Sequence, residues 1–255
     1  MFPLKDENPT ELTPVVTYIL IALNVAVWLL VQQAGAGDGF LQSLCTFGAI
    51  PADITGSLQA GQALELAPRA VCQVGGLGWL TILTSMFMHG GWMHLIGNMW
   101  FLWVFGNNIE DSMGHIRYVI FYLLCGVAAS LAHILTAPGS MVPTVGASGA
   151  ISGVMGAYLV LYPKVRVQTL FFFVIIIRIF MLPAWVLLIY WFAIQLLSGV
   201  GSLGAAEGGG VAFWAHIGGF VAGAALIKLF QRPQLVGAKR AHVKLSPDET
   251  HRLRW

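Results

Sequence analysis

Ser148 and His216 are the side chains of this sequence best suited to covalent chemistry. Ser148 stands in Gly146-Ala147-Ser148-Gly149, where an apolar stretch begins, and His216 stands in a later apolar stretch. A hydroxyl and an imidazole at membrane depth are costly unless they have a partner or a function. A serine flanked by glycine at the start of a helix is also how many acyl-transfer enzymes present a nucleophile. The pair therefore predicts serine hydrolase chemistry inside a bilayer.

The composition indicates a membrane protein. The chain is 57% hydrophobic and 9% charged, whereas soluble domains carry roughly 25% charged residues. So few charges cannot solvate a water-soluble protein of this length. The short basic C-terminal segment is interpreted as a solvated flank near anionic lipid and not as a nucleic-acid-binding arm.

Six apolar segments predict an all-α polytopic membrane protein with a six-helix bundle. They are Pro14–Val31, His89–Phe105, Ile116–Leu135, Ser148–Leu161, Leu182–Leu197 and Val211–Phe230. The run Leu170–Met181 is also apolar but contains Arg178. We interpret it as an interfacial or re-entrant piece, with a seventh span as the alternative.

The basic residues predict the orientation. With six spans, every one of the 13 lysines and arginines except Arg69 lies on the side of the two termini. By the positive-inside rule both termini are cytoplasmic, and we expect a multi-pass protein of the plasma (inner) membrane. A cleaved signal peptide at Pro14–Val31 is the less favoured alternative, because the segment lacks a basic start and its apolar core is long.

The chain divides into a short cytoplasmic segment 1–13, a membrane domain 14–231 and a basic cytoplasmic tail 232–255. The long extracytoplasmic interval 32–78 contains Cys45 and Cys72, which are interpreted either as a disulfide or as two buried thiols. The glycine-rich interval Gly199–Gly210 predicts a mobile loop.

Four polar side chains are predicted to reach a similar depth from the outer side. The fourth span is too short to cross a core of roughly 30 Å, so Ser148 lies below the surface. His216 and His94 enter their spans from the same side, and Asn98 shares the helical face of His94. His216 is the candidate general base. The candidate oxyanion donors are the backbone N–H groups of Ser148 and Gly149 together with Asn98 and His94. No Asp or Glu is expected at this depth, which predicts a dyad and not a triad.

Each feature also has a plainer interpretation. Small residues in membrane helices often form packing seams, and such a seam is expected between Gly149-x-x-x-Gly153-x-x-Gly156 and Gly219-x-x-x-Gly223. Both interpretations hold together, because tight helix contact brings Ser148 to His216. His115 and His133 are interpreted as packing residues. His89 and His94 are not expected to bind metal, because on one continuous helix they point apart.

The sequence resembles the rhomboid intramembrane serine proteases over about residues 80–225. The resemblance rests on four stretches: His89-Gly90-Gly91-Trp92-Met93-His94-Leu95-Ile96-Gly97-Asn98-Met99, Phe105-Gly106-Asn107-Asn108-Ile109-Glu110-Asp111, Gly146-Ala147-Ser148-Gly149-Ala150-Ile151, and Ala215-His216-Ile217-Gly218-Gly219-Phe220-Val221-Ala222-Gly223. It implies a six-helix fold, Ser148 as nucleophile, His216 as base, and His94 and Asn98 on the oxyanion side. It assigns structural roles to His89 and Glu110.

Two positions depart from the family pattern. Where many members have Trp-Arg in the first loop, this chain has Trp79-Leu80. Where some members have a tyrosine that stacks on the histidine, this chain has Ser152.

The sequence thus predicts a serine endopeptidase that cuts membrane proteins in or near their spanning segments. We expect transmembrane proteins and membrane lipids as partners, with no cofactor, no ATP, no metal and no nucleic acid. A non-catalytic membrane-protein binder of the same fold is the first alternative. A transporter is the second, and it would require polar residues along the whole membrane path.

Overall fold

The structure is a computed structural model that describes residues 1–58, 61–67, 70–73, 76–173, 176–203, 211–241 and 243–254. Arg69 and residues 204–210 of the glycine-rich interval lie outside the described residues.

In the part of the chain that the structure describes, six long helices form the polytopic membrane bundle, which confirms the predicted fold class. They are α1 (Val15–Ala26, continued by a π-helical turn Val27–Val31), α5 (Trp92–Met113), α6 (His115–Thr136), α7 (Ser148–Leu161), α8 (Ala184–Gly201) and α9 (Phe213–Phe230). Among the described helices, α6, α8 and α9 are long and apolar enough to cross a membrane by length and composition alone. The helix α5 is longer than predicted, since it continues through Glu110 and Asp111 to Gly114, whose positive φ of 83° ends it.

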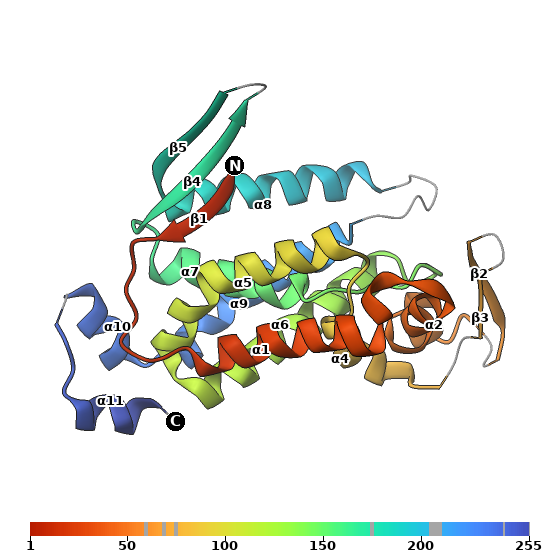
Figure 1. Cartoon of the computed structure of the whole chain (residues 1–255), viewed down its shortest axis with the longest axis horizontal. Coiled ribbons are helices and arrows are strands. Elements are labelled where there is room, and N and C mark those ends of the chain that lie inside the picture. Colours follow the sequence, from red (N-terminus) through yellow and green to blue (C-terminus); the bar gives the residue numbers. More distant parts are fainter. Residues whose placement is uncertain are drawn as a thin grey trace.

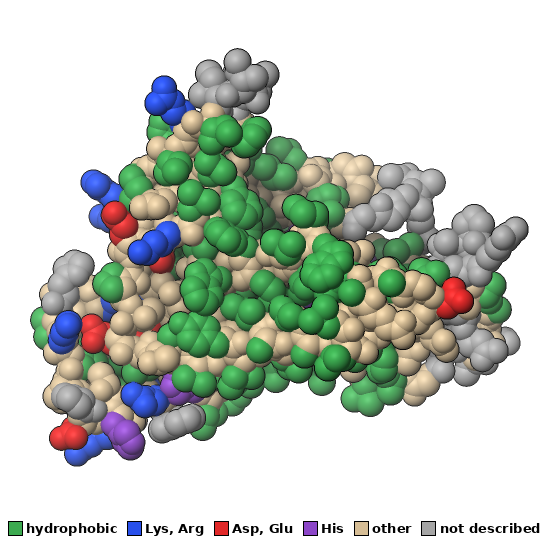
Figure 2. Space-filling view, in the orientation of Figure 1, with side chains coloured by type: hydrophobic (Ala, Val, Ile, Leu, Met, Phe, Trp, Pro, Cys, Tyr) green, Lys and Arg blue, Asp and Glu red, His purple; other side chains and the backbone are tan. Residues whose placement is uncertain are grey.

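The C-terminal helices α10 (Pro233–Arg240) and α11 (Pro247–Arg254) lie at one end of the bundle, and β1 (Phe2–Asp6) runs toward this end from the N-terminus (Figure 1). The hairpin of β2 (Ala63–Ala67) and β3 (Ala70–Gln73) lies at the opposite end, beside α2 (Gly37–Phe47). On the visible face, most charged side chains gather toward the end that carries α10 and α11, and hydrophobic side chains cover the flank of the helices (Figure 2). This distribution is the one expected of a bundle whose flank faces lipid.

The apolar run Leu170–Met181 forms part of a β-hairpin, so the alternative of a seventh spanning helix is wrong. Strands β4 (Arg166–Phe173) and β5 (Ile176–Pro183) pair antiparallel, with Phe171 opposite Arg178. The run is dominated by β-branched and aromatic residues, which favour strands. The N-terminal strand β1 (Phe2–Asp6) pairs with the other edge of β4, so the sheet order is β1-β4-β5 (Figure 1).

The interval between α1 and α5 is folded at the end of the bundle opposite α10 and α11 (Figure 1). Besides α2 and the β2–β3 hairpin it contains α3 (Pro51–Ile54) and α4 (Thr81–Thr84). Cys45 is disulfide-bonded, so the alternative that Cys45 is a free buried thiol is wrong. The side chain of Cys72, its predicted partner, lies outside the described residues. Cys125 is a buried free thiol in α6.

The C-terminal tail packs on the bundle in part, which corrects the interpretation of a solvated flank. It forms α10 (Pro233–Arg240) and α11 (Pro247–Arg254). Leu235 and Val236 are buried, and Lys239 Nζ lies 2.8 Å from Asp111 Oδ2 at the end of α5. The basic segment is therefore held on the bundle by burial of apolar side chains of α10 and by an ion pair with Asp111. The net charge of the segment does not predict this packing.

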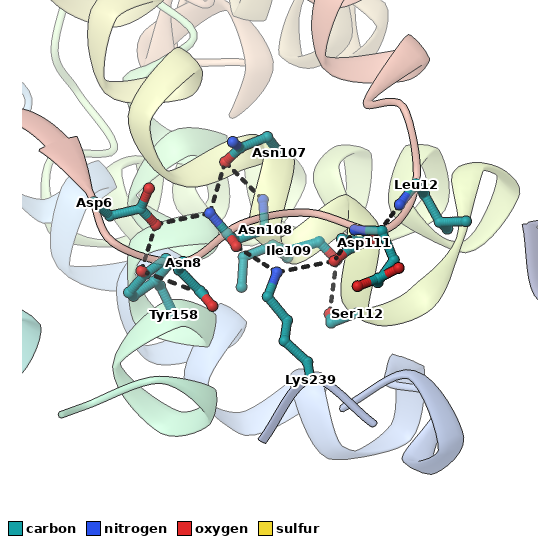
Figure 3. A network of polar contacts seen from close by, with 11 residues as sticks. Asp6, Asn8, Leu12, Asn107, Asn108, Ile109, Asp111, Ser112, Tyr158 and Lys239 are labelled. Carbon is teal, nitrogen blue, oxygen red and sulfur yellow. Dashed lines mark hydrogen bonds and ion pairs between the residues drawn. The ribbon is translucent and has the colours of Figure 1, made fainter. Parts of the chain in front are cut away.

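A polar network joins both terminal segments to this end of the bundle (Figure 3). Asp6 Oδ2 accepts hydrogen bonds from Tyr158 (2.6 Å) and from Asn108 Nδ2 (2.7 Å). Lys239 Nζ donates to Asn108 Oδ1 at 2.5 Å and to Asp111. Burial raises the pKa of the Asp6 carboxyl to about 6, against the lowering effects of the Tyr158 hydrogen bond and the Lys239 charge. Burial likewise lowers the pKa of Lys239, although Asp111 opposes the shift.

Candidate functional site

Ser148 is the first residue of α7, and the backbone before it is unusual. Gly146 has a φ of 132°, a region that side chains disfavour. Its N–H donates to the Ser85 carbonyl at 2.9 Å, which fixes the approach to the helix. In the described part of the chain, the N-cap residue Ala147 provides no side-chain cap, and the first N–H groups of any helix have no partner within that helix. The turn therefore presents a hydroxyl next to backbone N–H groups that can donate to a ligand.

His216 of α9 lies within hydrogen-bond distance of Ser148. His216 Nε2 and Ser148 Oγ are 2.7 Å apart. The contact depends on close packing of α7 and α9: a β-carbon at Gly219 would overlap the Gly149 carbonyl oxygen, and one at Gly223 would overlap the Gly153 carbonyl oxygen. The glycine seam and the serine–histidine pair thus belong to one helix interface.

Helix α8 places two further side chains around His216 that the sequence analysis did not identify. Gln195 Oε1 lies 2.8 Å from His216 Nδ1, and the Trp191 ring lies 5.8 Å from the imidazole at an interplanar angle of 39°. In some members of the family that the sequence resembles, a tyrosine at the position of Ser152 stacks on the histidine. In this chain Trp191 contacts the His216 ring instead. Ser152 Oγ instead donates to the Ser148 carbonyl at 2.6 Å. A lone amide in an otherwise apolar span was the available signal for Gln195.

His94 and Asn98 face the pair from α5. The Gly90 N–H donates to His94 Nδ1 at 3.2 Å, and this hydrogen bond leaves Nε2 as the protonated donor. A β-carbon at Gly146 would lie 2.8 Å from His94 Nε2 and 3.4 Å from Ser148 Oγ, so both atoms border the same small space. The Asn98 side chain is buried, and its Nδ2 donor has no hydrogen-bond partner in the described part of the chain. These are the donors that an oxyanion beside Ser148 requires.

A cavity of about 1400 Å³ contains the site. Its described lining comes from α2, α5, α6, α7, α8 and α9, and from the loop that includes Ser140–Thr144. The described lining contains no Asp, Glu, Lys or Arg. An amide, and not a carboxylate, thus faces the second nitrogen of His216.

His89 and Glu110 lie outside the hydrogen-bonded pair and hold helices in place. The backbone of His89 is clamped by Gln32, whose Nε2 and Oε1 bond its C=O and N–H at 2.7 Å each. Glu110 is fully buried and accepts the N–H groups of Val16 and Thr17 at 2.9 and 2.8 Å, which caps the start of α1.

Two expectations about histidines can be compared with the geometry. His115 Nδ1 lies 2.5 Å from Glu110 Oε1, as expected of a histidine with a structural partner. The expectation that His89 and His94 diverge was wrong: their rings are in contact, with centroids 5.2 Å apart. His89 precedes the start of α5 at Trp92, so the helical spacing assumed for the two residues does not apply.

The fold and the site define a polytopic membrane bundle with a hydrogen-bonded serine–histidine pair in an internal cavity. A family model described as Rhomboid domain matches residues 77–233, more than half of the 255-residue chain. The chain belongs to the rhomboid family.

Curated relatives agree with this assignment. RHOMBOID-like protein 6, mitochondrial, of Arabidopsis thaliana is 29% identical over 173 residues, covering 61% of this chain and 54% of that protein. Rhomboid protease GluP of Bacillus subtilis (strain 168) is 31% identical over 146 residues, covering 57% of this chain and 24% of GluP. Presenilin-associated rhomboid-like protein, mitochondrial, of Mus musculus is 34% identical over 92 residues, covering 35% of this chain and 24% of the relative. The chain thus spans about half or less of the length of these relatives.

Proposed function

We propose that this chain is an intramembrane serine endopeptidase that hydrolyses peptide bonds in or near the spanning segments of membrane proteins. The observation that carries the proposal is the 2.7 Å contact between Ser148 Oγ and His216 Nε2 inside a cavity of the membrane bundle. The similarity to Rhomboid protease GluP supports the same reading.

The proposed reaction has two steps. Ser148 Oγ attacks the carbonyl carbon while His216 Nε2 takes its proton, and the proton passes to the leaving amine as the peptide C–N bond breaks. Water then attacks the acyl-enzyme ester, His216 again takes and returns a proton, and the free carboxylate and Ser148 hydroxyl are released. These steps consume one water and need no ATP, cofactor or metal.

The negative oxygen formed in each step is assigned to the space bordered by His94 Nε2, the Asn98 amide and the N–H groups at the start of α7. Donors placed in advance stabilise the transition state because they need no reorganisation as charge develops. A substrate helix must unwind locally before its carbonyl reaches this space, because its peptide groups are shielded by their own hydrogen bonds.

The alternatives predict other features. A transporter needs a polar path across the membrane, whereas the apolar side chains of Phe105 and Val154 lie fully buried further along α5 and α7. A non-catalytic binder of the same fold has no need for a hydrogen-bonded serine–histidine pair. Both termini are proposed to be cytoplasmic and the membrane to be the plasma (inner) membrane, with the site near the outer surface.

The test is proteolysis in liposomes. Purified chain and a single-span substrate are reconstituted together, and product termini are mapped by mass spectrometry. We expect cuts near the extracytoplasmic end of the substrate span, lost in Ser148→Ala and in His216→Ala while both variants stay folded. Cleavage by purified Ser148→Ala, or cuts confined to the cytoplasmic half, would contradict the proposal. A folded wild type that binds the substrate without cutting it would favour the binder.

A further inference from the structure

Gln195 is a polar residue in an apolar helix, and its amide faces the candidate base. It is 8% exposed in α8, and its Oε1 lies 2.8 Å from His216 Nδ1. The other nitrogen of the same ring contacts Ser148 Oγ. His216 is thus held at both ends, by α7 through one nitrogen and by α8 through the other.

The tautomer of His216 decides whether it can act on Ser148. If Nδ1 carries the proton and donates it to the amide oxygen, Nε2 has a free lone pair and accepts the Ser148 O–H. If the amide were turned so that its NH₂ donated to Nδ1, Nε2 would carry the proton and could not take another. The orientation of one neutral amide therefore selects the competent form.

The neighbours of Gln195 restrict the imidazole further. Trp191 precedes Gln195 by one helical turn and lies against the ring, while Phe192 stacks on Phe220 of α9 with centroids 4.6 Å apart. Among the described residues, the other titratable side chains that line the cavity are His94 of α5 and His133 of α6. No described carboxylate lines the cavity.

We infer that Gln195 is a positioning residue of the hydrolase: its amide oxygen holds His216 in the Nδ1–H tautomer and aims Nε2 at Ser148. This inference rests on the proposed function. It adds a third participant to the predicted dyad and makes the placement of α8 a condition for catalysis.

The experiment uses the full chain in detergent and in liposomes, with two changes at position 195. Gln195→Met keeps the length of the side chain and removes the acceptor oxygen. Gln195→Glu keeps an acceptor and removes the competing donor. Leu196→Ala, at the neighbouring position, whose side chain is 37% exposed, is the matched control for disturbance of α8.

We expect Gln195→Met to lower kcat roughly 10- to 100-fold with KM changed less than threefold, part of the full 10²–10⁴-fold contribution of a general base. Gln195→Glu should keep at least a tenth of the wild-type kcat. It should also move the acidic limb of kcat/KM to higher pH, because a carboxylate favours the protonated imidazole. Leu196→Ala should leave kcat and the pH profile unchanged.

A second measurement reads the tautomer directly. In ¹⁵N-histidine-labelled protein, the His216 signals, assigned by their loss in His216→Ala, should report Nδ1–H in the wild type and in Gln195→Glu. Gln195→Met should show a mixture of tautomers.

The inference is overturned if Gln195→Met retains wild-type kcat, if it leaves the tautomer unchanged, or if Gln195→Glu is as impaired as Gln195→Met with an unshifted profile. Failure of the proposed function gives a different result, since the wild type itself would then neither cleave substrate nor react with a fluorophosphonate.

Discussion

Gly223 of α9 packs directly on the Gly153 carbonyl oxygen of α7, and a β-carbon at position 223 would overlap that oxygen. Because the overlapping atom belongs to the backbone of α7, a side chain at position 223 fits only if the two helices move apart. Because α9 carries His216 and α7 carries Ser148, their separation sets the hydrogen bond between the two side chains.

Gly223→Ala should therefore lower kcat roughly 100-fold, the loss that a displacement of about 1 Å can cause. Overpacking should also destabilise the protein by about 1–3 kcal/mol. The measurements are substrate cleavage and the thermal midpoint in detergent. Gly237→Ala in α10 is the matched control, since a β-carbon there meets nothing within 4 Å and the position does not line the cavity. Equal activity of the two variants would show that the seam does not set the site.

Asn98 provides a buried donor without a described partner in the cavity. Asn98→Ala should lower kcat about 10²–10³-fold with a small change in KM, because the donor matters most when charge develops on the substrate oxygen. Ile96→Ala, at an exposed position of α5, is the control. An effect on KM alone would make Asn98 a substrate-binding or packing residue.

Glu110 should matter for folding and not for chemistry. Glu110→Ala leaves the Val16 and Thr17 N–H groups and the His115 imidazole without their acceptor. Loss of one member of such a buried group costs about 3–5 kcal/mol. The thermal midpoint should fall strongly while fluorophosphonate labelling per folded molecule stays unchanged. Exposed Glu7→Ala should change neither quantity, and a labelling defect in well-folded Glu110→Ala would place Glu110 in the catalytic machinery.

Asp6 should make the stability of the terminal network depend on pH. Its pKa is about 6 in the folded protein against 3.8 ordinarily, so between these values the folded state binds more protons than the unfolded chain. Its stabilising contribution is complete below about pH 4 and is lost as pH rises through 6, by at most about 3 kcal/mol. Lys239, Lys5 and Tyr158 are the charged or titratable groups that act on this carboxyl.

Asp6→Asn removes this titration but keeps an oxygen that accepts from Tyr158. The wild type should therefore lose stability relative to Asp6→Asn as pH rises from 4 to 7, measured as the difference between their thermal midpoints. Glu7→Gln, at the exposed neighbouring position, should show no such trend. A constant difference between wild type and Asp6→Asn over this range would refute the assignment.

The sequence predicted the spans well because long apolar runs leave little choice but a membrane helix. It could not predict the β4–β5 hairpin, in which β4 also pairs with Phe2–Asp6, far away in the chain. Hydropathy did not predict the packing of the C-terminal tail either. That packing depends on contacts of Lys239 with Asp111 and Asn108, which are distant in the sequence.

Within the site, the juxtaposition of Ser148 with His216 follows from small residues on two spans, a pattern visible in the sequence. The contact of Gln195 with His216 could not be predicted, because a lone amide marks the residue but the spacing does not give the direction in which α8 faces. Ser152 provides no ring to stack on His216, so the sequence did not predict an aromatic contact with that histidine. The contact comes from Trp191, on another helix.

The most direct test of the account is the site of covalent reaction with a fluorophosphonate probe. The purified chain is labelled in detergent, digested, and the adduct located by mass spectrometry in the wild type, Ser148→Ala and His216→Ala. We predict a single adduct on Ser148, absent from both variants although they remain folded. An unlabelled wild type that is folded, or an adduct on another serine that persists in Ser148→Ala, would contradict the central claim that Ser148 and His216 form the catalytic pair.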